Sequence, residues 1–229
     1  MRQISTSYSL LTFLDELEYT EAALAADPDA ASLAAAFEER IGEWDALFRA
    51  ERNGRRAVTR ADAVVAVRNA QLDRNTTQLA ALAKAHDASG GLLKRFFGSL
   101  APSRFIAQSL RKQSERTRDV VLAEIDKLDA AHPARSVRTP LASSVEAVLG
   151  ALDARNEARG TRQIGANDIG DWKSGVNKLR TTTYAELLKI AVEKSYGRNW
   201  ADTFFREDSS GKNDVGPGAE EPPVPSPTA

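Results

Sequence analysis

The chain contains no cysteine, and its 229 residues include one methionine and two histidines. Without cysteine there is no disulfide framework, no thiolate metal site and no cysteine nucleophile. No stretch approaches the roughly 18 apolar residues that a membrane-spanning helix needs. The N-terminal apolar run is interrupted by Asp15, Glu16 and Glu18, so it does not resemble a secretory signal. We therefore expect a soluble cytoplasmic protein, with no membrane partner.

The chain also has no large excess of either charge, because its 31 Lys and Arg residues are balanced by 32 Asp and Glu residues. The overall balance gives no argument for binding to nucleic acid or to a membrane. The charged residues are distributed unevenly along the chain. The net charge is −8 over 1–45, +10 over 46–118, +1 over 119–201 and −4 over 202–229. Segments of opposite charge can neutralise each other when helices pack together.

Glycine and proline are confined to a few places, and no segment alternates between apolar and polar residues as a strand does. The pattern therefore predicts an all-α fold with helices over about 7–26, 30–88, 102–131 and 141–196. The first break is Asp27-Pro28-Asp29, where we expect Asp29 to cap the next helix. The third and fourth helices are separated by a connection from His132-Pro133 to Thr139-Pro140.

The predicted helix over 30–88 carries a regular seam at alternating spacings of four and three residues. This spacing is that of the a and d positions of a coiled coil. The seam consists of Phe37, Ile41, Trp44, Phe48, Glu51, Arg55, Val58, Asp62, Val65, Asn69, Leu72, Thr76, Leu79 and Ala83.

A weak internal repeat relates residues 54–91 to residues 160–197, with ten identities in 38 pairs at a shift of 106. Two seam positions argue against a clean duplication, because the apolar Val65 and Leu72 align with the charged Asp171 and Lys178. We interpret the fold as an elongated antiparallel four-helix bundle with coiled-coil-like long helices, built by duplication of a short-long helix pair. The bundle would cover 1–205, in halves of about 1–98 and 99–205. Residues 206–229 are acidic and rich in proline and glycine, and are predicted to be disordered.

Polar residues occupy the middle of both long helices, where a seam is normally apolar. The pattern Gly-x-Arg-x-[Val/Ile]-x-x-x-Asp occurs there twice, beginning at Gly54 and at Gly160. One interpretation is a ligand site for a small anion, with Arg55, Arg56, Arg159 and Arg162 as its candidate residues. The structural alternatives are a network that fixes helix register and simple exposure to solvent, and these take precedence.

A second basic set lies on the third predicted helix, where Arg104, Arg111 and Arg118 are seven residues apart and would share one face. This stripe is a candidate for weak nucleic-acid association, but it has no interleaved aromatic residues and no known nucleic-acid motif. The acidic first helix is an alternative internal partner. The pairs Phe96-Phe97 and Phe204-Phe205 follow glycine-containing breaks, and we expect them to close the core rather than to form an adhesive patch.

No catalytic, metal-binding or cofactor-binding constellation stands out. His86 and His132 have no metal-ligand spacing, and neither a phosphate-binding glycine loop nor a nucleophile elbow occurs. The leading hypothesis is therefore a non-enzymatic structural or interaction protein that acts through helix faces, by self-association or within a larger assembly. The alternatives are a small-anion-binding bundle and a weak nucleic-acid binder.

Overall fold

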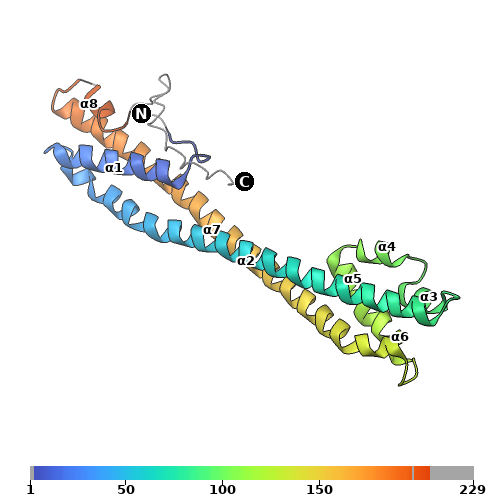
Figure 1. Ribbon diagram of the computed structural model, residues 1–229. Coiled ribbons are helices and arrows are strands. Elements are labelled where there is room, and N and C mark those ends of the chain that lie inside the picture. Colours follow the sequence, from blue (N-terminus) through green and yellow to red (C-terminus); the bar gives the residue numbers. More distant parts are fainter. Residues whose placement is uncertain (1–2, 198, 207–229) are drawn as a thin grey trace, which may run out of the picture. The chain divides into compact units, whose positions relative to one another are not determined.

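The computed structural model describes residues 3–197 and 199–206, and every regular element in them is helical (Figure 1). The all-α prediction is confirmed. In chain order the elements are α1 (Leu10–Ala26), η1 (Ala31–Leu33), α2 (Ala35–His86), α3 (Gly91–Phe97), α4 (Pro102–Ile106), α5 (Leu110–Arg116), η2 (Thr117–Val121), α6 (Leu122–Asp126), η3 (Pro133–Val137), α7 (Arg138–Glu193) and α8 (Asn199–Asp202). None of the helices in the described residues is long and apolar enough to cross a membrane.

The chain divides into two compact units. The first unit combines Met1–Ile41 with Asn177–Ala229, and the second is Gly42–Val176. Each of the long helices α2 and α7 contributes to both units. The halves 1–98 and 99–205 that the repeat suggests are a different division, and they stay a prediction.

The first unit is built around α1, which begins at a well-formed cap. The Ser9 side chain accepts a hydrogen bond from the Thr12 backbone N–H, which satisfies one of the free donors at the helix start. Phe13, Leu17 and Leu24 repeat at intervals of four and seven residues, and all three are completely buried. They share the unit with buried residues from the later parts of the chain, namely Phe37, Leu187, Ala191, Ala201, Phe204 and Phe205.

Two aspartates tie the turn after α1 to the end of α7. Asp29 accepts hydrogen bonds from Lys194 Nζ at 2.7 Å and from the Tyr196 hydroxyl at 2.8 Å. Asp27 accepts one from Trp200 Nε1 at 3.1 Å. The prediction that Asp29 caps the second helix is therefore wrong, because its carboxylate is engaged by residues distant in the chain. A short helix, η1, lies between this turn and α2.

The second unit has a continuous apolar core between the last part of α2, the first part of α7 and the short helices α3 to α6 (Figure 1). The largest completely buried side chains in it are Phe96, Phe97, Phe105, Leu72, Leu79, Ile125 and Leu141. Phe97 packs edge-on against Phe105 with ring centroids 5.1 Å apart. Since Phe204 and Phe205 are also buried, in the first unit, the expectation that both phenylalanine pairs serve the core is confirmed.

The third predicted helix, over 102–131, is interrupted in the structure. Residues 107–109 separate α4 from α5, and η2 is a turn of π-helix within the helical run from α5 to α6. The break lets Phe105 pack inward on α4, while the Arg116 guanidinium of α5 lies over the Phe105 ring at 5.5 Å. Local helix propensity did not reveal this interruption because the packing of Phe105 decides it.

The seam of α2 agrees with burial at both ends of that helix, where Phe37 and Trp44 are buried as well, and fails in its middle. Val65, Leu72, Thr76, Leu79 and Ala83 are all buried, whereas Phe48 and Arg55 are exposed. Positions that the repeat aligns also differ, since Arg74 is exposed and Arg180 is buried. The coiled-coil packing and the duplication stay predictions. The predicted tail, 206–229, lies outside the described residues except for Arg206.

Candidate functional site

Two of the predicted anion-binding arginines meet a carboxylate where α2 and α7 lie close together. A methyl group added at Gly54 would lie 3.3 Å from Cγ of Arg162, so a larger residue would crowd this contact. Arg162 Nη2 lies 3.4 Å from Glu51 Oε1, and Arg55 Nε donates a hydrogen bond to the same oxygen. Burial raises the pKa of Glu51, but the hydrogen bond and charge of Arg55, followed by those of Arg162, outweigh it and lower the pKa overall.

A second carboxylate, that of Asp62, pairs with arginines of α7 about three helical turns beyond Glu51 along α2. Asp62 on α2 accepts a hydrogen bond from Arg159 Nη2 at 3.0 Å, and Arg155 Nε lies 4.0 Å from the same oxygen. Three of the four candidate residues therefore face carboxylates between the two long helices. The fourth, Arg56, is exposed and has no ion-pair partner among the described residues. The arrangement is a set of ion pairs between helices, and the anion site stays a hypothesis.

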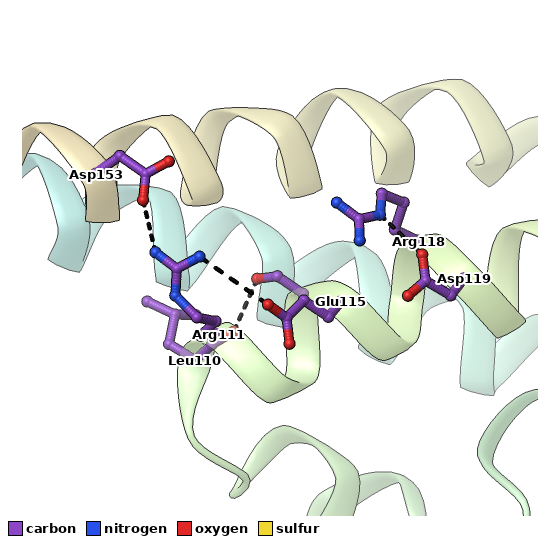
Figure 2. A network of polar contacts seen from close by, with 7 residues as sticks. Leu110, Arg111, Glu115, Arg118, Asp119 and Asp153 are labelled. Carbon is purple, nitrogen blue, oxygen red and sulfur yellow. Dashed lines mark hydrogen bonds and ion pairs between the residues drawn. The ribbon is translucent and has the colours of Figure 1, made fainter.

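The three nucleic-acid candidates do not lie on one helix. Arg104 is exposed on α4, Arg111 belongs to α5 and Arg118 belongs to η2. Arg111 Nη2 lies 2.6 Å from Asp153 Oδ1 of α7, and Arg111 Nη1 lies 4.0 Å from Glu115 Oε1 on its own helix. Figure 2 shows both contacts.

Arg118 is held in the same way by a neighbouring acid. It donates a hydrogen bond to Asp119 at 2.8 Å (Figure 2), and this bond lowers the pKa of the Asp119 carboxyl. Two of the three candidate cations are thus already paired with acids. The acids come from α5, η2 and α7 and not from the first helix, which was the expected internal partner.

The outer face of α2 carries cations that have no such partners. We define the outer stripe as Arg52, Arg56, Arg60, Val64 and Val67, which follow one another at spacings of four, four, four and three residues. Residues at these spacings share one helix face. All five are exposed, with 47% of Val64 and 57% of Val67 accessible. Within the described part of the chain, none of the three arginines has an ion-pair partner.

The structure also shows a half-open cavity of about 930 Å³ in the first unit. Its walls include Tyr8, Glu16, Tyr19, Arg180 and Phe205. Arg180 is only 2% exposed, and its Nη1 lies 3.2 Å from Glu16 Oε2. Burial lowers the pKa of Arg180, and the Glu16 charge opposes that shift. Arg180 and Glu16 thus satisfy each other's charge in this wall, which Asp202 and Arg206 also line.

The two histidines lie together at one end of the second unit, with ring centroids 5.7 Å apart. His132 Nδ1 accepts a hydrogen bond from the Ala134 backbone N–H, which leaves Nε2 as the free ring nitrogen. Across the described residues, no group of three or more metal-ligating side chains suited to a metal ion is present.

Sequence reasoning missed several of these features. The Arg180–Glu16 pair joins residues far apart in the chain, so no local motif marks it. The outer stripe could have been found, because the helical spacing of Arg52, Arg56 and Arg60 is visible in the sequence and no acid falls on that face between them. The histidine pair required the tertiary fold.

Comparison with known proteins adds no relative. No protein-family model matches the chain, and neither the curated proteins nor the solved structures contain a significant match. The function must therefore be argued from the chain's own geometry.

Proposed function

We propose that this chain is a non-enzymatic, cytoplasmic protein-protein interaction protein that docks its partners on exposed faces of its long helices. The observation that carries the proposal is the outer stripe of α2, where two exposed valines continue a row of three arginines that have no ion-pair partner in 3–197 and 199–206. A contiguous exposed apolar patch rimmed by polar residues is typical of surfaces that contact other proteins.

The position of this stripe within the second unit supports the proposal. The apolar core of the unit begins at Val65 on α2 and ends at Leu152 on α7. Between Glu51 and Asp62 of α2, ion pairs to Arg159 and Arg162 join this helix to α7. Ile164 of α7 is exposed in this region as well. A partner helix would cover apolar surface that the unit itself leaves in water.

The finer architecture belongs to the same proposal. The fold proposed from the sequence is an elongated antiparallel four-helix bundle of the chain's own helices, in halves of about 1–98 and 99–205. The coiled-coil-like seam and the origin of the chain by duplication of a short-long helix pair are part of this hypothesis. Anion binding by the arginines between the helices and nucleic-acid association through Arg104, Arg111 and Arg118 remain the alternatives.

The test is to make the apolar part of the stripe charged. We expect Val64→Asp combined with Val67→Asp to abolish the protein complexes that native mass spectrometry and cross-linking detect, because a partner would then have to bury unpaired carboxylates. Circular dichroism verifies that the variant keeps its helix content.

The matched control changes two exposed valines elsewhere, Val120→Asp with Val192→Asp. This control should leave the complexes intact. If both double variants keep their complexes, or both lose them equally, the outer stripe is not the docking surface and the proposal is wrong.

A further inference from the structure

We propose that the occupant of the outer stripe is the acidic face of α1 from a second copy of this chain, lying antiparallel to α2. This inference rests on the proposed function and names its partner. It follows from three observations: the unpaired charges on both faces, the match in their spacing, and the opposite net charges of the two units.

The acidic face of α1 consists of Leu11, Asp15, Glu18, Ala22 and Ala25, which we call the acidic stripe. Their spacings of four, three, four and three residues place them on one side of the helix, opposite the buried Phe13, Leu17 and Leu24. All five are exposed, and Leu11 is 54% accessible. In the described part of the chain, neither Asp15 nor Glu18 has an ion-pair partner.

The two stripes match in spacing. At about 1.5 Å of rise per residue, Asp15 and Glu18 lie about 6 Å and about 10 Å along the helix from Leu11. Counted backwards from Val64, Arg60 and Arg56 lie about 6 Å and about 12 Å away. An antiparallel arrangement therefore sets Leu11 against Val64, with Asp15 opposite Arg60 and Glu18 opposite Arg56.

The remaining residues of the acidic stripe favour this contact too. Ala22 and Ala25 are small, so they allow the two helices to approach closely while the Arg52 side chain lies along them. A parallel arrangement would also bring the acids to arginines, but it would set Leu11 against Arg52. Only the antiparallel arrangement joins the exposed Leu11 to an exposed valine.

The net charges of the two units also favour this contact, because they are opposite in sign. The second unit carries 22 Lys and Arg against 16 Asp and Glu, whereas the first carries 9 against 16. The first unit of one copy is therefore attracted to the second unit of another. A polyphosphate would satisfy the arginines but would leave Val64 and Val67 exposed, so the observations favour the second copy over a nucleic acid.

The contact uses different surfaces on the two copies, so it is heterologous. Such a contact need not give a closed two-fold dimer and can continue to further copies. Each copy has one acidic stripe and one outer stripe, and it can therefore bind two neighbours. We expect concentration-dependent assembly beyond the dimer that weakens as salt screens the exposed charges.

Charge variants of the full chain provide the test, with sedimentation velocity at low salt as the readout. Reversing one stripe, by Asp15→Lys with Glu18→Lys or by Arg56→Glu with Arg60→Glu, turns two attractive pairs into repulsive ones. We expect either double variant to weaken self-association by about tenfold or more. The quadruple variant, which exchanges both pairs of charges, should recover assembly because the pairs are restored with opposite sign.

Neutral variants test the heterologous character of the contact. Asp15→Asn with Glu18→Gln keeps only the outer stripe, and Arg56→Gln with Arg60→Gln keeps only the acidic stripe. Each should remain monomeric alone, and an equimolar mixture should stop at a one-to-one dimer. Because the chain has no cysteine, Leu11→Cys in one copy and Val64→Cys in the other should then form a specific disulfide in the antiparallel arrangement.

The inference is overturned if the quadruple variant does not recover assembly, if the mixture stays monomeric, or if Ala22→Cys cross-links to Val64→Cys in place of Leu11→Cys. It is also overturned if the arginine variants lose only retention on immobilised DNA while self-association is unchanged. The proposed function is tested separately from this inference. It still holds after these outcomes if Val64→Asp with Val67→Asp removes a complex with a different protein.

Discussion

Neutralising Glu16 should destabilise the first unit because the change leaves the Arg180 guanidinium buried without its counter-charge. Arg180 is 2% exposed, and the Glu16 side chain is 17% exposed. Arginine stays charged at all ordinary pH values, so it cannot respond by losing its proton. Its remaining contacts are Thr20 Oγ1 at 3.4 Å and the face of the Phe205 ring at 5.0 Å.

The magnitude follows from the position of the pair. Removing one partner of a fully buried ion pair costs about 3–5 kcal/mol. Glu16 borders the cavity, so water reaches the site and reduces this penalty, and we expect Glu16→Gln to cost about 2–3 kcal/mol. In a chain of this size the loss corresponds to a fall in Tm of about 5–10 °C.

The assay is thermal and urea denaturation followed by circular dichroism and by tryptophan fluorescence, with Asp126→Asn as the control. Asp126 forms a two-pronged pair with Arg138 at 2.9 Å, but both side chains are over 40% exposed, so its loss should cost less than about 1 kcal/mol. Glu16→Met with Arg180→Met should be much less destabilising than Glu16→Gln alone, since no unpaired charge is left. If Glu16→Gln lowers Tm no more than Asp126→Asn, the reasoning about desolvation is refuted.

Two further predictions concern pH and backbone conformation. The hydrogen bond from Lys194 is the main cause of the lowered pKa of Asp29, so the stability that Asp29 contributes is present above its unfolded value of about 3.9 and is lost as pH falls through the folded pKa. Asp29→Asn should therefore destabilise the protein at pH 7, and its difference from the wild type should shrink as the pH falls below about 3.9 in urea titrations; a constant difference would contradict this. Gly98 has φ +66°, and a Cβ there would meet Arg116 Nη2 at 2.7 Å, so Gly98→Ala should cost about 1–3 kcal/mol. By contrast, a Cβ added at Gly160 has nothing within 4 Å, so Gly160→Ala should stabilise α7 by about 0.5–1 kcal/mol. If calorimetry shows that both substitutions change the free energy of unfolding in the same direction, the comparison is refuted.

The two long helices could be predicted from the sequence with good accuracy. The long proline-free stretch predicted over 30–88 corresponds to α2, Ala35–His86, and the stretch predicted over 141–196 corresponds to α7, Arg138–Glu193. These boundaries follow from local rules, since proline, glycine and capping residues act within one helical turn. The burial of Leu72 and Leu79 on the seam follows from the same periodicity.

The partners of the charged residues could not be predicted from the sequence. Three of the four arginines proposed for anion binding, Arg55, Arg159 and Arg162, are held by Glu51 and Asp62, and a periodic pattern does not reveal which acid faces which cation. The stripe of Arg104, Arg111 and Arg118 depended on an unbroken helix, which the packing of Phe105 interrupts.

The sequence by itself determined the all-helical class and the extent of the two long helices, because these depend on residues within a few positions of one another. Only the tertiary structure decided that Arg180 is buried beside Glu16 and that Asp29 binds Lys194 and Tyr196. It also decided that Arg52, Arg56 and Arg60 have no ion-pair partner in the part of the chain that the structure describes. These outcomes depend on contacts between residues far apart in the chain, which hydrophobic burial brings together and which no local pattern encodes.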